Sequence, residues 1–126
     1  MTFPENIKYT KDHEWIKVTG TEALVGITDY AQGELGDIVF VEVETIGESL
    51  SKGQVFGTIE AVKTVSDLFI PIAAEVIELN AKLDGKPELI NQDPYGEGWI
   101  VKLKINNASD LDQLMSSQQY QEMINA

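Results

Sequence analysis

Short runs of apolar and β-branched residues, each bounded by turn-forming residues, recur along most of this chain and restrict its possible folds more than any other feature. Residues 14–19 (EWIKVT) and 22–27 (EALVGI) are two such runs, and only Gly20 and Thr21 separate them, which suits a β-hairpin. Residues 38–44 (IVFVEVE) place Val and Glu at alternate positions and predict another strand. Because many short strands with few helical segments favour packed sheets, we predict a mainly β fold, either a sandwich or a flattened barrel.

Helical patterns are a minority and occur in two places. Thr28 can cap a short internal helix over residues 28–35, and Gly36 can end it. Near the end of the chain, residues 109–115 and 116–124 predict two short helices, the second of which opens with the capping-box pattern Ser-x-x-Gln. The side chains expected to pack this tail against the sheet are Leu111, Leu114, Met115, Tyr120, Met123 and Ile124.

The remaining strand prediction and the chain length define the domain. The turn pattern DPYG at residues 93–96 leads into an apolar run at 98–105, which predicts a strand preceded by a β-turn. A chain of 126 residues has the length of one domain and can bury roughly two thirds of its unfolded surface. We therefore expect a single domain over residues 1–126, with a β core at about 8–105 and a helical segment at about 109–125.

The charge balance is strongly acidic, because 21 Asp and Glu residues face 9 lysines and the chain has no arginine. A net charge of −12 repels the phosphates of nucleic acids and of anionic membranes. The planar guanidinium group that recognises phosphates and bases in a bidentate way is also missing. We therefore expect neither a nucleic acid nor a membrane as a partner. The acidic surface either steers the chain towards basic protein surfaces or serves solubility alone.

Cysteine is absent and His13 is the only histidine, which limits the chemistry available to the chain. Disulfides and thiolate zinc sites are excluded, and the seryl residues lack the bases of a catalytic triad. We expect no catalytic residue and no metal site, and we expect His13 to be a surface or hydrogen-bonding residue. The start of the chain has neither an apolar signal core nor an arginine-rich transit segment, so the expected compartment is the bacterial cytoplasm.

Lys63 occupies a distinctive position between two predicted strands. Residues 54–62 and 65–72 both have the composition of strands, so the simplest fold places the lysine at the bend between them. The bend lacks the Asn-Gly or Asp-Gly pairs that tight hairpins favour. Lys63 is also the only basic residue within 53–81. It is either a solvated lysine paired loosely with a nearby carboxylate such as Glu60 or Asp67, or an isolated amine presented for modification.

The segment EAVKTVSD at residues 60–67 resembles the modification hairpin of lipoyl and biotinyl carrier domains, in which one lysine carries the prosthetic group. Glu60, three residues before the lysine, belongs to the lipoyl pattern. A biotin carrier typically flanks its lysine with methionines, whereas Val62 and Thr64 stand here. The resemblance therefore implies lipoic acid on Lys63, with Glu60 taking part in recognition by the lipoylating enzyme.

The resemblance extends over about residues 8–124 and is specifically to the family of glycine cleavage system H proteins. Ordinary lipoyl domains of the 2-oxoacid dehydrogenases lack three of the four blocks that carry it. The blocks are KYTKDHEW (8–15), VGITDYAQGELGDIVFVE (25–42), GTIEAVKTVSDLFIPI (57–72) and PELINQDPYGEGWIVKLKI (87–105). The family implies a lipoyl-domain-like fold, the barrel-sandwich hybrid, with a short internal helix and short C-terminal helices.

A few positions depart from the usual pattern of that family. Ala61 stands where serine is common, Ala73 and Ala74 replace a Ser-Gly pair, and Thr45 replaces a proline. A glycine at position 74 suggests a turn with positive φ, which alanine adopts only at some cost. The sequence therefore leaves the conformation of the backbone after Pro71 open.

The family resemblance implies a monomeric carrier without catalytic residues of its own. Its lipoyl group would receive the aminomethyl group of glycine from a pyridoxal-phosphate-dependent glycine decarboxylase. A tetrahydrofolate-dependent aminomethyltransferase would then take the one-carbon unit, and dihydrolipoyl dehydrogenase would reoxidise the dithiol. Because a free amine next to sulfur decomposes in water, we expect a cleft that shields it, with Glu14 and Asp67 as acidic contacts for the ammonium group.

Three alternatives remain open at this point. A lipoyl relay protein, which donates lipoyl groups to the carriers of 2-oxoacid dehydrogenases, would use the same residues. A biotin carrier of a carboxylase and an unmodified interaction module are the other two. A lipoyl mass on Lys63 of protein from the native host would exclude both of these.

Overall fold

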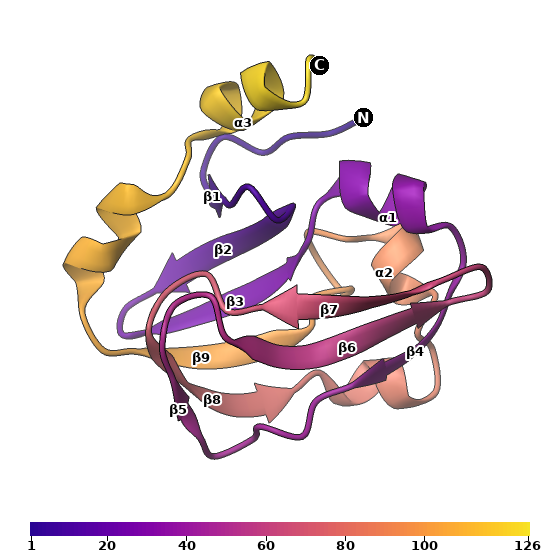
Figure 1. Cartoon of the computed structure of the whole chain (residues 1–126), viewed down its shortest axis with the longest axis horizontal. Coiled ribbons are helices and arrows are strands. Elements are labelled where there is room, and N and C mark those ends of the chain that lie inside the picture. Colours follow the sequence, from indigo (N-terminus) through magenta and orange to yellow (C-terminus); the bar gives the residue numbers. More distant parts are fainter.

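The computed structural model describes residues 1–126 and consists mainly of two antiparallel β-sheets that pack face to face (Figure 1). The larger sheet contains, from edge to edge, β1 (Lys8–Tyr9), β2 (Glu14–Thr19), β3 (Glu22–Ile27), β9 (Val101–Ile105), β8 (Ala74–Leu79) and β5 (Ser49–Leu50). The smaller sheet contains β4 (Ile38–Glu42), β6 (Val55–Ala61) and β7 (Val65–Phe69). The sheets do not close into a barrel, and the predicted mainly β sandwich is confirmed.

The helices are short and lie at the edges of the sheets. The α-helices are α1 (Asp29–Leu35), α2 (Leu89–Gln92) and α3 (Ser117–Met123), and the 3₁₀ helices are η1 (Ala81–Asp84) and η2 (Ala108–Gln113). The predicted caps of α1 are confirmed: the Thr28 hydroxyl accepts from the amide of Ala31, and Gly36 ends the helix with φ of 80°. No helix is long and apolar enough to cross a membrane.

The hairpin of β2 and β3 has the predicted boundaries and positions a buried tryptophan. Thr19 faces Glu22 across the turn, and Gly20 adopts a φ of 65°. Trp15 in β2 pairs with Gly26 in β3, and the indole ring lies directly over that glycine, where a side chain would collide with it. A glycine is therefore required at position 26 because the ring occupies the space of a Cβ atom.

One continuous apolar core lies between the two sheets. Buried side chains of the larger sheet, such as Ile16 and Leu103, pack together with Phe56 and Ile59 of β6. Ile70 and Ile72 also belong to this core although they follow β7 rather than extend it. The prediction of a strand over 65–72 was therefore too long: β7 ends at Phe69, and the apolar pattern of the last residues reflects their burial, although Ile70 still exchanges backbone hydrogen bonds with Gly53 and Gln54.

Other strand predictions differ from the structure for a similar reason. The predicted strand 38–44 ends at Glu42, and the predicted strand 98–105 begins only at Val101, although Ile100 is fully buried. Strand β8 (AEVIEL) was not predicted, yet it pairs with β9 through most of its length. The two strands are about 25 residues apart in sequence, so no short turn connects them and no turn-forming residues mark their pairing.

The departures from the family pattern fit the fold without strain. Ala74 is fully buried at the start of β8, opposite Leu50, and it does not have a positive φ, so the backbone that the sequence left open after Pro71 needs no left-handed residue at this position. Thr45 donates a hydrogen bond from its hydroxyl to the carbonyl of Phe56 at 2.8 Å. This bond ties the segment after β4 to the smaller sheet.

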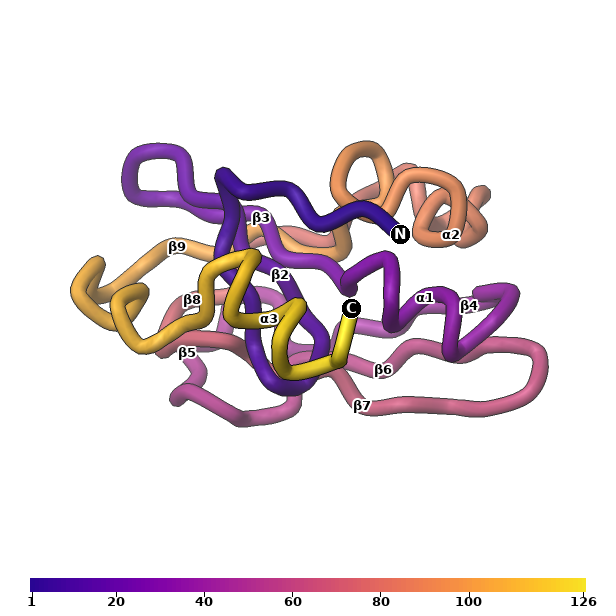
Figure 2. Tube along the Cα trace, turned by 90° about the horizontal axis from the view of Figure 1, so that it is seen from above, coloured from indigo at the N-terminus to yellow at the C-terminus, as the bar shows by residue number.

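The C-terminal segment covers a second apolar cluster built around Tyr9, Trp15 and Tyr120. The capping box of α3 is present as predicted, but the preceding helix is of the 3₁₀ type. Met123 is 41% exposed, so its predicted packing against the sheet was wrong, because α3 turns its face bearing Tyr120 towards the cluster. The two termini lie on the same side of the molecule (Figures 1 and 2).

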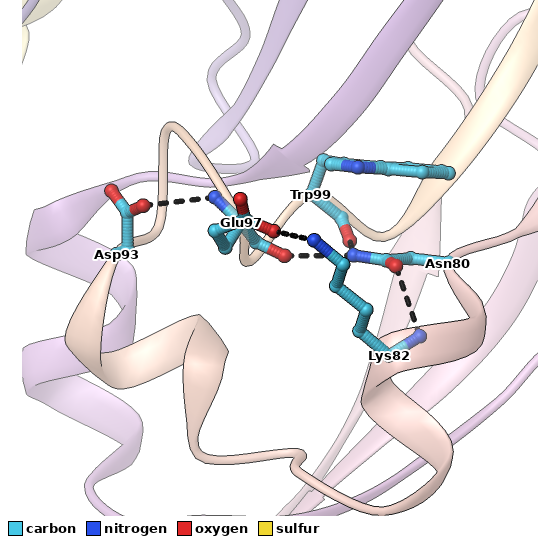
Figure 3. Close-up of polar contacts among 5 residues, drawn as sticks. All are labelled: Asn80, Lys82, Asp93, Glu97 and Trp99. Carbon is cyan, nitrogen blue, oxygen red and sulfur yellow. Dashed lines mark hydrogen bonds and ion pairs between the residues drawn. The ribbon is translucent and has the colours of Figure 1, made fainter.

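A buried asparagine organises the loop before β9 (Figure 3). The amide nitrogen of Asn80 donates to the carbonyls of Glu97 and Trp99, both at 2.8 Å, and its oxygen accepts from the backbone of Lys82. Glu97 also forms an ion pair with Lys82, and its amide donates to the carboxylate of Asp93. The predicted turn at 93–96 is confirmed by a bond from the Gly96 amide to the Asp93 carbonyl at 3.1 Å.

Candidate functional site

Lys63 lies at the tip of the turn between β6 and β7, which protrudes at one end of the molecule (Figures 1 and 2). Glu60 and Val65 are the last paired residues, and the amide of Ala61 donates to the carbonyl of Thr64 at 2.8 Å. No residue of this turn has a positive φ. The predicted bend is therefore confirmed, and it needs no Asn-Gly pair because its backbone avoids the left-handed region.

The turn is held from outside the hairpin as well. The amide of Val62 donates to the carbonyl of Asp37 at 3.0 Å, which joins the tip to the segment that follows α1. The aliphatic stem of Lys63 passes over Gly36, where a Cβ atom would lie 3.3 Å from Cε of the lysine. The tip of the turn therefore rests against the end of α1.

The amine of Lys63 is exposed and makes no ion pair or hydrogen bond within the chain. The two ion pairs of the molecule are Lys82–Glu97 and Lys102–Glu78, both distant in sequence from the turn. The loose pairing of Lys63 with a nearby carboxylate, one of the alternatives from the sequence, does not occur. The amine is free for acylation.

A cleft of about 300 Å³ lies beside the hairpin, on the side of α1. Residues 12–14 form one wall, Tyr30, Glu34 and neighbouring residues of α1 form another, and residues 66–68 of β7 form the third. Leu35 lines the cleft directly before Gly36, over which the lysine stem passes. An arm that starts at Lys63 thus begins next to the cleft.

Glu14 is buried in the wall of this cleft, with only 2% of its surface exposed. Its Oε2 accepts a hydrogen bond from the amide of Phe69 at 2.7 Å, while its Oε1 is buried and has no partner. Burial raises the pKa of Glu14 to about 8, because the bond from Phe69 compensates only part of the lost hydration. At neutral pH the side chain is therefore mostly a neutral acid with one unused oxygen.

Asp67 and Glu60 lie at the surface in different positions relative to the cleft. Asp67 is exposed and borders the cleft, so the structure brings it to the same site as Glu14. Glu60 is exposed and does not line the cleft. It pairs with Phe40 and Val65, which are 50% and 63% exposed, so it belongs to a mixed acidic and apolar face next to the lysine.

His13 lines the cleft and is a hydrogen-bonding residue, as expected. Its backbone is in the left-handed region with φ of 67°, and its Nδ1 lies 2.8 Å from the hydroxyl of Tyr120. Burial lowers the pKa of His13, although the carboxylates of Asp12 and Glu34 oppose this effect. The lowered pKa favours the neutral form of the ring.

The comparisons with known proteins agree on one family. A family model described as Glycine cleavage H-protein matches residues 7–126. The glycine cleavage system H protein of Bacteroides fragilis is 60% identical over 126 residues, covering 100% of both chains, and that of Bacteroides thetaiotaomicron is 56% identical over 125 residues, covering 99% of each. A crystal structure of a glycine cleavage system H protein from Mycobacterium marinum matches with a TM-score of 0.88 and 35% identity, covering 98% of this chain and 99% of that one.

The chain belongs to the glycine cleavage H-protein family. Its fold is the lipoyl-domain-like barrel-sandwich fold that the resemblance implied. Membership favours a carrier of the glycine cleavage system over the lipoyl relay, the biotin carrier and the unmodified module. The resemblance drawn from the four sequence blocks is thereby confirmed over the whole chain.

Several residues of the site in this H-protein family member were not predicted from sequence. Tyr30 and Glu34 face the cleft from α1, and their spacing of four residues places them on one side of the helix. That spacing was the available signal, but it does not say which side faces the cleft. Tyr120 was expected only to pack against the sheet, whereas its hydroxyl also reaches His13 and Thr28.

Proposed function

We propose that this chain carries lipoic acid in amide linkage on Lys63 and serves as the mobile carrier of the glycine cleavage system. The observation that carries the proposal is a free, exposed lysine at the tip of a protruding turn, next to a cleft whose lining includes Glu14, a buried side chain with one unpaired carboxyl oxygen. The family of the chain supports the same function. The chain itself contributes no catalytic residue in this proposal.

The proposed partners are the enzymes that load, unload and reoxidise the arm. They are glycine decarboxylase, aminomethyltransferase and dihydrolipoyl dehydrogenase, together with the enzyme that lipoylates the chain. When attached, the lipoyl group supplies a disulfide that accepts the aminomethyl group of glycine and is later regenerated by oxidation. We further propose that residues 1–126 act as one monomeric carrier domain in the bacterial cytoplasm.

We propose that Glu14 and Asp67 hold the ammonium group of the loaded arm in the cleft. When Glu14 is ionised, its Oε1 atom is a buried acceptor without a donor, and an ammonium group is a donor with a compensating charge. A nearby cation would favour the ionised form and would lower the raised pKa of Glu14. Asp67 borders the same cleft from the surface and adds a second acceptor.

We propose that Glu60 contributes to recognition by the lipoylating enzyme. Its side chain is exposed, it lies three residues before Lys63, and it does not line the cleft. The adjacent side chains of Phe40 and Val65 are largely exposed. An enzyme surface that combines basic and apolar groups would complement this face.

The proposal is tested by replacing the lysine with arginine, which keeps the charge and a similar stem but cannot form the lipoyl amide. We expect Lys63→Arg to fold like the wild type, to gain no lipoyl mass from a lipoylating enzyme, and to support no glycine-dependent release of carbon dioxide with the partner enzymes. Thermal unfolding, intact mass and carbon dioxide release are the measurements.

The matched control is Lys17→Arg, the same change at an exposed lysine of β2. This variant should gain the lipoyl mass and support glycine cleavage at the rate of the wild type. Lipoylation or full glycine cleavage by Lys63→Arg would disprove the attachment site. Transfer of the lipoyl group from the loaded chain to a 2-oxoacid dehydrogenase carrier, without glycine cleavage, would favour the relay function instead.

A further inference from the structure

The hydroxyl group of Tyr120 joins two walls of the cleft from outside it. Tyr120 belongs to α3 and is fully buried. Its oxygen lies 2.8 Å from Nδ1 of His13 and 2.8 Å from Oγ1 of Thr28. His13 belongs to the wall formed by residues 12–14, and Thr28 caps α1, which forms another wall. One phenol near the C-terminus therefore links a residue of one wall to the N-cap of the helix that forms another wall.

The protons of these three groups can be assigned because their partners are few. Oγ1 of Thr28 already accepts from the amide of Ala31 at 3.1 Å. Thr28 is fully buried, and the only other partner of its hydroxyl is Tyr120. If Tyr120 donated to Thr28, the hydroxyl proton of Thr28 would be buried without an acceptor, which costs free energy. Thr28 therefore donates to Tyr120, and Tyr120 donates to Nδ1 of His13.

This direction determines the protonation of His13. A nitrogen that accepts a hydrogen bond carries no proton, so the ring proton of neutral His13 is on Nε2. Nε2 has no partner within the chain, and His13 is only half-buried at the cleft. The imidazole ring packs edge-on against the ring of Tyr120, with 5.8 Å between the ring centroids, and against the ring of Tyr30, with 5.1 Å between the centroids.

We infer that Tyr120 is a positioning residue of the cleft, which holds His13 as a neutral ring with its N–H at Nε2. The functional part of this inference rests on the proposed carrier function. A neutral His13 does not repel the ammonium group of the loaded arm, whereas a cationic ring in the same wall would. An N–H at Nε2 is also a donor, so it cannot compete with Glu14 for the ammonium protons and is available to an acceptor atom of the arm.

The backbone of His13 shows why a positioning residue is needed. A non-glycine residue at φ of 67° is in a sparsely populated conformation that persists only when its surroundings hold it. The His13 amide donates to the carbonyl of Thr10, and the His13 carbonyl accepts from the amide of Thr28. Tyr120 adds a contact to the side chain of His13. The phenol ring of Tyr120 is itself held by stacking on the ring of Tyr9, with 4.9 Å between the ring centroids.

The test uses the full chain and reads His13 directly, because it is the only histidine. Proton–nitrogen NMR of the imidazole in wild-type protein at neutral pH should show the tautomer with its proton on Nε2, whether or not the chain is lipoylated. Tyr120→Phe should remove the donor to Nδ1, so the ring should populate both tautomers. The loaded adduct on this variant should decompose faster by about 2- to 10-fold, the range expected for loss of one hydrogen bond.

Tyr9→Phe is the matched control. Tyr9 is equally buried, but its hydroxyl donates to the carbonyl of Pro4 at 2.6 Å and does not contact His13. This variant should keep the wild-type tautomer and adduct lifetime even if it loses as much stability as Tyr120→Phe. A wild-type ring with its proton on Nδ1 would overturn the inference even if Tyr120→Phe failed to fold. So would a Tyr120→Phe variant with the wild-type tautomer and adduct lifetime.

The tautomer measurement also separates this inference from the carrier function. It requires no lipoyl group, so it can fail while Lys63 is still lipoylated and glycine is still cleaved. Conversely, absence of lipoylation at Lys63 would disprove the carrier function and leave the assignment of His13 standing.

Discussion

Replacing Glu14 by glutamine should change how the stability of the fold depends on pH. The glutamine has nearly the same shape and can still accept the hydrogen bond from the amide of Phe69. It cannot ionise, so it removes only the titration of the buried carboxyl. The remaining acidic residues are unchanged in the variant, and the difference between variant and wild type isolates the contribution of Glu14.

The sign and size of the effect follow from the raised pKa of Glu14, about 8 in the fold against 4.5 for an ordinary glutamate. Below pH 4.5 the carboxyl is protonated in both folded and unfolded chains, and it does not alter their balance. As the pH rises, the unfolded chain ionises first, so stability is lost until the folded carboxyl also ionises near pH 8. The interval of about 3.5 pKa units corresponds to a loss of at most about 5 kcal/mol, of which about 3 kcal/mol is lost by pH 7.

Urea unfolding of wild type and Glu14→Gln between pH 4 and pH 9 is the assay. The free energy of unfolding of the variant should rise relative to that of the wild type by about 1.4 kcal/mol for each pH unit above 4.5 and should level off near pH 8. Glu60→Gln, the same substitution at an exposed position, should stay within about 0.5 kcal/mol of wild type at each pH. A constant difference between Glu14→Gln and wild type over the whole range would refute the burial argument for Glu14.

Two other predictions concern the surface charge and the packing of the hairpin. The rate of association with glycine decarboxylase should fall as the salt concentration rises, because a net charge of −12 steers encounters electrostatically. Asp67→Asn alone should change this rate little. An association rate that is independent of salt would show that the acidic surface serves only solubility. Gly26→Ala should lower the free energy of unfolding by about 1–3 kcal/mol, because its Cβ would lie 2.8 Å from the Trp15 ring. Gly33→Ala in α1, where the new Cβ meets nothing within 4 Å, should instead raise the free energy of unfolding by about 0.5–1 kcal/mol. Equal effects of the two substitutions in thermal or urea unfolding would contradict the packing argument.

The elements that could be predicted from sequence are those that short-range chemistry determines. The hairpin of β2 and β3 has its predicted limits because Gly20 supplies the left-handed turn residue. Helix α1 begins and ends as predicted because Thr28 and Gly36 are local caps. The bend at Lys63 was found through its strand-like flanks and its family resemblance, since its own residues carry no turn signal.

The sequence by itself thus determined the fold class, the family and the position of the lysine, because periodicity, caps and motifs lie within short segments of the chain. Only the tertiary structure decided the electrostatics of the cleft. Glu14 meets the amide of Phe69, 55 residues away, and Tyr120 meets His13, 107 residues away. The burial of Glu14, its unpaired oxygen and the direction of the hydrogen bond to His13 all depend on which distant segments pack together. No local sequence pattern predicts that packing.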